Sequence, residues 1–162
     1  MSTKLSNGRK TDLPMAESRS LQLLFQLADA QKLLVEHVAH RLTALGYSGV
    51  TSGALGFLGQ LDCGPNHASE IARRLGVSRQ MVAKTVTEME HKGWLEQVPD
   101  PHLRNRKLIR FTAAGEQLMS NARATLAELD QQLDREFGSG WTAALADNLS
   151  ALKASLTETG SD

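Results

Sequence analysis

The chain has 162 residues and equal numbers of basic and acidic residues, 18 of each, so its formal net charge at pH 7 is zero. This length suits one domain with a hydrophobic core, and 41% hydrophobic and 22% charged residues are typical of a globular protein. No stretch contains the ~20 consecutive apolar residues of a membrane span, and the N-terminal residues lack the apolar segment of a secretion signal. We therefore expect a cytoplasmic protein with no membrane partner.

Residues 1–15 are polar and are expected to form a mobile tail. A long helix is expected over 16–45, because apolar residues recur there at intervals of three and four. One apolar stripe contains Leu21, Leu24, Phe25, Ala28, Val35, Val38 and Leu42, and a second contains Leu23, Leu27 and Leu34. Two stripes are more than a helix on the surface of one domain needs, so another surface is expected to cover the second stripe.

A shorter helix, capped by Thr51-Ser52, is expected to run to about 61. Gly53, Gly56 and Gly59 lie inside this segment, and each weakens a helix interior by about 0.5–1 kcal/mol relative to alanine. The simpler interpretation is a weak helix that its neighbours hold in place. The alternative is that the glycines allow close helix packing or leave room for a ligand.

Two short helices joined by a tight turn are expected over 68–75 and 79–92. Gly76 suits the turn because glycine adopts positive φ without a steric penalty, and Ser78 can cap the second helix. The second helix has an apolar face that can pack, formed by Val82, Val86 and Met89, and a polar face formed by Gln80, Lys84, Thr87 and His91. The polar face is therefore left free.

A basic hairpin follows Gly93, with strands expected over 94–98 and 108–112. Between the strands lie the turn Pro99-Asp100-Pro101 and a tip with Arg104, Arg106 and Lys107. Helix, turn, helix and basic hairpin together predict a winged helix-turn-helix over 51–112. Residues 67–112 carry nine Lys/Arg against five Asp/Glu, and such a local positive potential attracts phosphate even when the net charge of the chain is zero.

Two amphipathic helices are expected after the hairpin, over about 113–136 and 141–156. Their apolar residues are spaced by three and four: Leu118, Ala122, Leu126, Leu129 and Leu133 on the first, and Trp141, Leu145, Leu149, Leu152 and Leu156 on the second. Because the winged helix already closes its own core, these helices need another partner. We expect a homodimer in which 16–45 and 113–157 are the dimerisation helices.

The central segment resembles the core of the MarR family of winged-helix transcription regulators through EIARRLGVSRQMVAKTVTEMEHKGWLE, followed by DPHLRNRKLIRFTAAG, and the flanking helices extend the MarR-like domain over 17–157. The resemblance implies a mainly α fold with a small β-hairpin wing, and a homodimer in which the first and last helices of two subunits interlock. It also implies a repressor that binds a pseudo-palindromic operator in double-stranded DNA. Family members often hold phenolic or other aromatic ligands between the dimer helices and the winged helix, so a small aromatic ligand is expected to relieve repression.

Ten residues are expected to contact DNA, because the second helix of a helix-turn-helix enters the major groove and the wing lies beside it. They are Ser78, Arg79, Gln80, Met81 and Lys84 on the second helix, Ser69 and Arg73 on the first helix, and Arg104, Arg106 and Lys107 on the wing. Arg79 suits guanine and Gln80 suits adenine, while Met81 either touches a thymine methyl or is half-buried. Ser69 and Arg73 are better placed for phosphate, which positions the protein but reads no sequence.

The wing departs from the family pattern, which usually has Asp and Arg two residues apart near the tip, because this chain has Leu103 and Asn105 there. Arg104 and Arg106 flank these positions, and either could enter a narrow minor groove, where the negative potential is enhanced. The carboxylate that would orient the arginine is missing from its usual place, and Asp100 is the candidate substitute. The altered wing leaves a winged-helix module for protein–protein binding as an alternative function.

No enzyme, metal site or cofactor is expected. The chain has no Gly-rich phosphate loop, no nucleophile–base motif and no histidines at a compact zinc spacing. The single cysteine, Cys63, excludes a disulfide within the chain and is expected to be structural, which leaves a redox sensor with weak DNA contact as a further alternative. Ligand-binding residues stay unknown, because Phe25, His37, Arg41 and Phe57 suit a cleft or ordinary packing equally well.

Overall fold

The computed structural model describes residues 18–62, 64, 66–103 and 105–159. In these residues the elements follow one another as α1 (Arg19–Ala44), α2 (Ser52–Leu58), α3 (Ala68–Leu75), α4 (Arg79–His91), β1 (Leu95–Pro99), β2 (Lys107–Phe111), α5 (Ala113–Phe137) and α6 (Trp141–Thr159). The expected fold class, mainly α with a small β-hairpin wing, is therefore confirmed. The expected polar tail, 1–15, lies outside the described residues.

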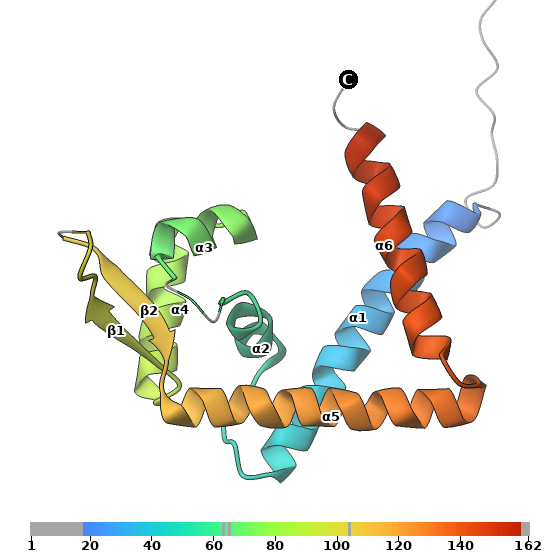
Figure 1. Ribbon diagram of the computed structural model, residues 1–162, viewed down its shortest axis with the longest axis horizontal. Coiled ribbons are helices and arrows are strands. Elements are labelled where there is room, and N and C mark those ends of the chain that lie inside the picture. The colour runs from blue at the N-terminus through green and yellow to red at the C-terminus, as the bar shows by residue number, and fades with distance from the viewer. Residues whose placement is uncertain (1–17, 63, 65, 104, 160–162) are drawn as a thin grey trace, which may run out of the picture.

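The elements form two groups that are joined by α5 (Figure 1). One group, which we call the winged half, contains α2, α3, α4 and the hairpin of β1 and β2. The other group, the helical half, contains α1, α5 and α6. The helix α5 starts at the base of the hairpin, passes beneath the winged half, packs against α1 and ends at the corner where α6 begins. The two halves therefore share one continuous helix.

Side-chain caps begin four of the helices. The hydroxyl oxygens of Ser18, Thr51, Ser78 and Thr112 each accept a backbone N–H from the residue three positions further on. The first N–H groups of a helix have no partner inside the helix, so such a cap typically stabilises its helix by about 1 kcal/mol. The sequence predicts the caps at Thr51 and Ser78, whereas it places Thr112 at the end of the second strand.

The hairpin pairs β1 with β2 in antiparallel register, with Leu95 opposite Phe111. Both strands are displaced by one residue from the expected ranges. β1 starts later because Trp94 belongs to the turn after α4, where its side chain is buried and its N–H donates to the carbonyl of Met89 at 3.0 Å. β2 ends earlier because Thr112 is the N-cap of α5.

A close contact between α5 and the base of the hairpin joins the two halves. A Cβ placed on Gly115 would lie 2.0 Å from the carbonyl oxygen of Trp94 and 2.9 Å from its carbonyl carbon. These distances are shorter than van der Waals contact allows, so only glycine lets α5 pass this close to the hairpin. The contact fixes the direction in which α5 leaves the wing.

The hydrophobic core lies in the winged half and extends onto one end of α1 and one end of α5. Its least accessible apolar side chains are Leu42, Leu58, Ile71, Val82, Val86, Leu95, Ile109 and Leu118. On α4, the residues Val82, Val86 and Met89 are buried, as the sequence predicts. Because α4 packs through this face, its opposite, polar face is held toward solvent.

The segment between α2 and α3 is organised by a buried asparagine. α2 ends earlier than expected, because Gly59 forms its C-cap and the chain then turns. Oδ1 of Asn66 accepts the N–H of Asp62 at 2.9 Å, and Nδ2 donates to the carbonyls of Asp62 at 2.8 Å and Gly64 at 2.9 Å. The carbonyl of Asn66 also accepts the N–H of Ile109 at 2.8 Å. The segment before α3 is thereby attached to β2.

The helical half leaves much of its apolar surface uncovered. α1 buries Val38 and Leu42, while large apolar side chains elsewhere on this half are exposed. The exposed set is Leu23, Leu24, Phe25, Leu33 and Leu34 on α1, Leu126 and Phe137 on α5, and Trp141, Leu145 and Leu156 on α6. The surplus apolar surface that the sequence predicts for α1 is thus present. Within the described ranges, none of the helices combines the length and the apolar character needed to cross a bilayer.

Candidate nucleic-acid interface

The first turn of α4 presents polar side chains on a fixed backbone. Oγ of Ser78 accepts the N–H of Met81 at 3.1 Å, which determines where the helix begins. Arg79, Gln80 and Lys84 are exposed on the turns that follow. Because these side chains project from a helix whose other face is packed in the core, their positions are defined while their polar groups remain accessible.

Two adjacent arginines on α3 have different environments. Arg74 binds back onto its own domain, because its Nη1 donates to the carbonyl of Gln60 at 2.7 Å and lies 3.0 Å from Oδ2 of Asp62. Arg73 is exposed, and within the described residues no hydrogen bond or ion pair engages its guanidinium. Ser69 is half-buried at the start of the same helix. Arg73 is thus available to bind an anion, whereas Arg74 stabilises the α2–α3 connection.

The wing tip combines exposed basic residues with a turn that needs a special backbone conformation. Arg106 and Lys107 are exposed, and Arg104 lies outside the described residues. Asn105 has a φ of 64°, a left-handed conformation that asparagine adopts more readily than most residues. The position at which the family pattern has an arginine therefore serves the geometry of the turn in this chain.

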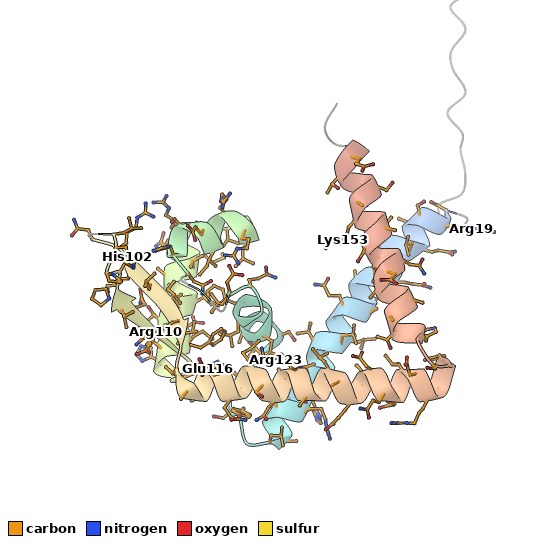
Figure 2. All side chains as sticks on the ribbon, viewed as in Figure 1. Arg19, His102, Arg110, Glu116, Arg123 and Lys153 are labelled. Atoms are coloured by element: carbon orange, nitrogen blue, oxygen red, sulfur yellow. The ribbon has the colours of Figure 1, made fainter. Side chains whose placement is uncertain are left out.

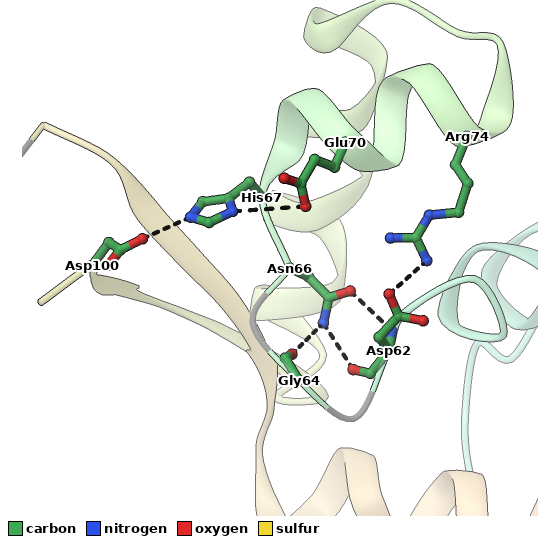
Figure 3. A network of polar contacts seen from close by, with 7 residues as sticks. All are labelled: Asp62, Gly64, Asn66, His67, Glu70, Arg74 and Asp100. Carbon is green, nitrogen blue, oxygen red and sulfur yellow. Dashed lines mark hydrogen bonds and ion pairs between the residues drawn. The ribbon is translucent and has the colours of Figure 1, made fainter. Parts of the chain in front are cut away.

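The carboxylate of Asp100 contacts no arginine side chain among the described residues. Because Arg104 lies outside them, the expectation that Asp100 orients a wing arginine stays a prediction. Oδ2 of Asp100 lies 2.7 Å from Nε2 of His67, and Oδ1 accepts the N–H groups of His102 at 2.8 Å and Leu103 at 3.2 Å. The N–H of His102 and then the imidazole of His67 lower the pKa of Asp100 below its ordinary value. The carboxylate therefore connects the wing to α3 (Figure 3).

The exposed basic residues lie at one end of the winged half. Figure 1 places α3, the first turn of α4 and the hairpin tip at the end farthest from α5, and Figure 2 labels His102 beside that tip. In the part of the chain that the structure describes, no ion pair engages Arg73, Arg79, Lys84, Arg106 or Lys107. Elsewhere Arg41 pairs with Glu128, and Arg110 pairs with Glu96. This end therefore carries a positive potential that no carboxylate neutralises by direct contact.

Sequence reasoning missed the roles of Asn66 and His67. An aspartate in a Pro-Asp-Pro turn is a recognisable signal for a carboxylate that accepts backbone N–H groups, so half of the environment of Asp100 was predictable. Its other partner, His67, is 33 positions away in the sequence. No local pattern connects two residues across that separation.

The family model described as MarR family matches residues 45–104, which run from the end of the first helix to the wing tip. Over these residues the chain is similar to the MarR family. Proteins of this family are winged-helix transcription regulators, as the resemblance in the α3–α4 and wing sequences implies. A comparison with curated protein sequences found no match.

Solved structures of MarR-like regulators have the same fold. RV1404 from Mycobacterium tuberculosis is 24% identical, with a TM-score of 0.63, and the match covers 83% of this chain and 95% of that chain. A MarR mutant from E. coli, complexed with operator DNA, is 19% identical, with a TM-score of 0.64 and coverage of 88% and 99%. The PcaV regulator from Streptomyces coelicolor, in complex with its natural ligand, is 20% identical, with a TM-score of 0.60 and coverage of 89% and 97%.

A cleft of about 640 Å³ separates α2 and α4 of this chain and reaches α1. Its lining includes Gln31, Gly53, Gly56, Phe57, Met81 and Met89. A Cβ placed on Gly56 would meet no atom within 4 Å, so this glycine borders open space and does not serve close helix packing. Of the four residues considered for a ligand site, Phe57 lines the cleft, whereas Arg41 is paired with Glu128 at 2.9 Å.

Histidines and Cys63 are the residues that a metal site or a redox sensor would use. Among the described residues, no three His, Asp or Glu side chains gather closely enough to hold a metal ion. His37 and His40 are exposed on α1. Cys63 lies outside the described residues, so the structural role predicted for it stays a prediction.

Proposed function

We propose that this chain is a MarR-type, dimeric, sequence-specific repressor, without enzymatic activity, that leaves a pseudo-palindromic operator when a small ligand binds. The observation that carries the proposal is the end of the winged half. There α3, α4 and the wing present Arg73, Arg79, Lys84, Arg106 and Lys107, which no carboxylate engages among the described residues. Such a cluster of exposed cations attracts phosphate groups. DNA is the phosphate-bearing polymer whose grooves a winged helix fits. The E. coli neighbour complexed with operator DNA supports this role.

Base reading is assigned to the first turns of α4. Arg79 can form a bidentate pair with guanine O6 and N7, and Gln80 can do so with adenine N6 and N7, each contributing roughly 1–3 kcal/mol of discrimination. Met81 is 56% exposed, which allows contact with a thymine methyl. Ser78 and Lys84 border this reading surface on the same helix.

Phosphate and minor-groove contacts are assigned to α3 and the wing. Ser69 and Arg73 on α3 would fix the orientation of the protein on the backbone of DNA. Arg104, Arg106 and Lys107 on the wing would enter or flank the minor groove, where a narrow groove enhances the negative potential. These contacts supply salt-dependent affinity and add no sequence preference.

The partner of the helical half is proposed to be a second copy of this chain. Ten large apolar side chains are exposed on α1, α5 and α6, and a monomer in water would leave this surface uncovered. A two-fold dimer would place two α4 helices in successive major grooves, about 34–36 Å apart. The operator is then expected to be a pseudo-palindrome with that spacing between its half-sites.

A ligand in the cleft between α2 and α4 would act on DNA binding directly. Met81 belongs both to the lining of the cleft and to the first turn of α4. A ligand changes affinity for DNA only as far as it prefers one arrangement of the reading helices, and an occupant beneath α4 has such a preference. The ligand-bound PcaV neighbour supports a small molecule as the effector. Phe57, Met81 and Met89 in the lining of the cleft suit a small aromatic compound.

Fluorescence anisotropy of the purified protein tests the proposal. The labelled DNA is the segment upstream of the gene for this chain, compared with a scrambled DNA across a salt series. We expect binding to the upstream DNA to be tighter by a factor of about 10³ or more and to weaken steeply as salt rises. Equal, weak binding to both DNAs at every salt concentration would contradict the proposal and favour a winged-helix module that binds protein.

A further inference from the structure

A shielded contact ties the hairpin to the start of α3 (Figure 3). Nε2 of His67 lies 2.7 Å from Oδ2 of Asp100, and Nδ1 of the same ring lies 3.8 Å from Oε2 of Glu70. The side chains of His67 and Asp100 are only 13% and 4% exposed. Surface ion pairs contribute little because water and salt screen them, and this contact is largely protected from both.

The direction of the hydrogen bond follows from the chemistry of the carboxylate. An ionised carboxylate oxygen can only accept, so Nε2–H of His67 is the donor and Asp100 is the acceptor. The charged imidazolium and the neutral tautomer with its proton on Nε2 both carry this N–H. The contact is therefore retained whether the imidazole is neutral or charged, and a hydrogen bond to an ionised group is stronger than a neutral one.

The same carboxylate also shapes the wing turn. Its other oxygen, Oδ1, accepts the backbone N–H groups of His102 and Leu103, and the backbone N–H of Asp100 donates to the carbonyl of Arg106 at 2.9 Å. Asp100 is thus bound to both sides of the turn that carries the basic tip. Whatever holds Asp100 in place also holds the tip.

The tip has an attachment that is separate from that of the strand behind it. The bond from the N–H of Ile109 to the carbonyl of Asn66 anchors the middle of β2. Asp100 lies beyond the end of β1, on the tip side of this anchor. Without the contact between His67 and Asp100, the hairpin would keep its inner anchor and its tip would be free to pivot about it.

We propose that His67 is a positioning residue for the wing: its bond to Asp100 makes the wing tip and the helix-turn-helix meet DNA as one rigid unit. The consequence for DNA binding rests on the proposed function. In this chain the contact takes over the task of the acidic partner that the family pattern places near the tip, but it orients the whole turn rather than one arginine.

The position of His67 makes the proposal testable without damage to α3. His67 is the N-cap residue of α3, yet its side chain makes no capping hydrogen bond. Replacing the ring therefore leaves the start of the helix unchanged. Gln is the conservative substitute, because its side-chain N–H can lie close to the position of Nε2, whereas Ala has no donor.

A spin label on the wing tip measures the attachment in the absence of DNA. The label is placed on Leu103→Cys in a Cys63→Ser background, which leaves one thiol in the chain. We expect a slowly moving label in the parent, a several-fold faster label in His67→Ala, and recovery of the slow spectrum in His67→Gln. Glu70→Gln is the matched control, and its label should move as in the parent. Equal label mobility in the parent and His67→Ala would overturn the proposal.

A pH series separates positioning from general packing. The charged groups that contact His67 in the described residues are Asp100 of the wing and Glu70 of α3. In the parent, label mobility should stay constant from about pH 8 to pH 5, the range in which histidine titrates. In Asp100→Asn the side-chain oxygen must stay in place of Oδ1, where it accepts the N–H groups of His102 and Leu103. The amide N–H then replaces Oδ2 and must donate to Nε2 of His67, which only the neutral ring allows. Mobility should therefore rise in this variant as the pH falls, and a flat profile would contradict the proposal.

Operator binding then tests the consequence for DNA. We expect His67→Ala to weaken binding about tenfold, the effect of losing one well-placed contact, and His67→Gln to restore it. In an Arg104→Ala/Arg106→Ala/Lys107→Ala background, which lacks all three wing contacts, His67→Ala should have no further effect, because the residue acts through the wing. Additive losses would overturn the proposal. If the parent itself fails to prefer operator DNA, the proposed function is wrong, and the spin-label results still decide whether His67 holds the wing.

Discussion

The winged half and the helical half bury their apolar side chains to different extents. In the winged half, Leu58, Ile71, Val82 and Ile109 are almost inaccessible to solvent. In the helical half, Phe25 and its neighbours on α1 are exposed, and α6 buries none of its described side chains fully. The winged half therefore has a complete core, whereas the helical half exposes apolar side chains that only a second chain would cover.

The difference assigns separate tasks to the two halves. A complete core gives the reading helix a fixed position without help from a second chain. An incomplete one makes the spacing between two reading helices a property of the dimer. Affinity for one half-site should then follow the winged half, and recognition of a full operator should follow the helical half.

The largest expected effect comes from breaking the joint between the halves with Gly115→Ala. The added methyl would overlap the carbonyl of Trp94, so α5 must move away from the hairpin. We expect the free energy of unfolding to fall by about 3 kcal/mol or more, measured by urea denaturation at fixed protein concentration. The matched control is Gly56→Ala, whose methyl meets open space. Equal stability of the two variants would show that α5 does not pass as close to the hairpin as described.

The second test separates the halves by preventing assembly. Phe25→Glu places a charge on the apolar face of α1. Phe25 is 60% exposed in the monomer, so the fold of one chain should tolerate the change. Burying an unpaired charge in a dimer interface is strongly unfavourable, and light scattering should report a monomer with far weaker operator binding. Gln26→Glu adds the same charge to an exposed polar position of α1 and should remain dimeric. A dimeric Phe25→Glu protein would exclude this face of α1 from the interface.

The third test compares two arginines within the winged half. Arg79→Ala should remove roughly 1–3 kcal/mol of preference for one base pair. Arg106→Ala should weaken binding to all sequences and reduce the salt slope by about one, because it removes a phosphate or minor-groove contact. Anisotropy on a set of single-base operator variants distinguishes the two. Unchanged affinity with altered preference in Arg106→Ala would show that the wing reads sequence.

A smaller effect is expected from filling the cleft between α2 and α4. Gly56→Leu should extend into the space beside Met81 while leaving the polar face of α4 unchanged. We expect operator affinity close to that of the parent and loss of the response to salicylate, a phenolic probe, in a release assay. Gly56→Ala should keep whatever response the parent shows. If salicylate releases the Gly56→Leu protein from operator DNA as readily as it releases the Gly56→Ala protein, the effector binds elsewhere.

The smallest expected effect concerns the corner between α5 and α6. Oδ2 of Asp134 accepts the N–H of Gly140 at 3.0 Å and Oδ1 accepts that of Thr142 at 3.4 Å, and these donors lower the pKa of Asp134 below its ordinary value of 3.8. The folded chain therefore favours the charged carboxylate, and the stabilisation is present above pH 3.8 and lost as the pH falls below it. Asp134→Asn should reduce stability slightly at pH 7 and make the loss of stability below pH 3.8 smaller. The midpoints of urea denaturation at pH 7 and below pH 3.8 measure both effects. An unchanged acid profile would remove Asp134 from this role.

Local rules explain which parts of the fold could be predicted. Ser78 and Gly76 mark the ends of helices through short-range geometry, and α3 and α4 follow the expected ranges closely. The strand ends could not be predicted, because Trp94 packs behind α4 and Thr112 serves α5, and both choices depend on the tertiary structure.

The candidate interface was only partly predictable for the same reason. Exposure of Arg73, Arg79 and Lys84 follows from helical periodicity once the apolar face is known. Among the described residues, Arg74 is paired and Arg73 is free because Asp62 lies within reach of Arg74, in a turn that Asn66 organises. Helical periodicity cannot predict the position of Asp62. The DNA contacts of these residues, and the domain limits 17–157 and 51–112, remain predictions.

The helix α5 is also a lever arm. Its 25 residues span about 37 Å at 1.5 Å per residue. One end is fixed to the hairpin base through Gly115 and Trp94, and the other carries the corner with α6. A tilt of about 5° over such a length displaces the far end by roughly 3 Å, close to the rise of one base pair in DNA. A change in the angle of α5 that is too small to disturb any core contact could thus move α4 of one subunit out of register with its half-site.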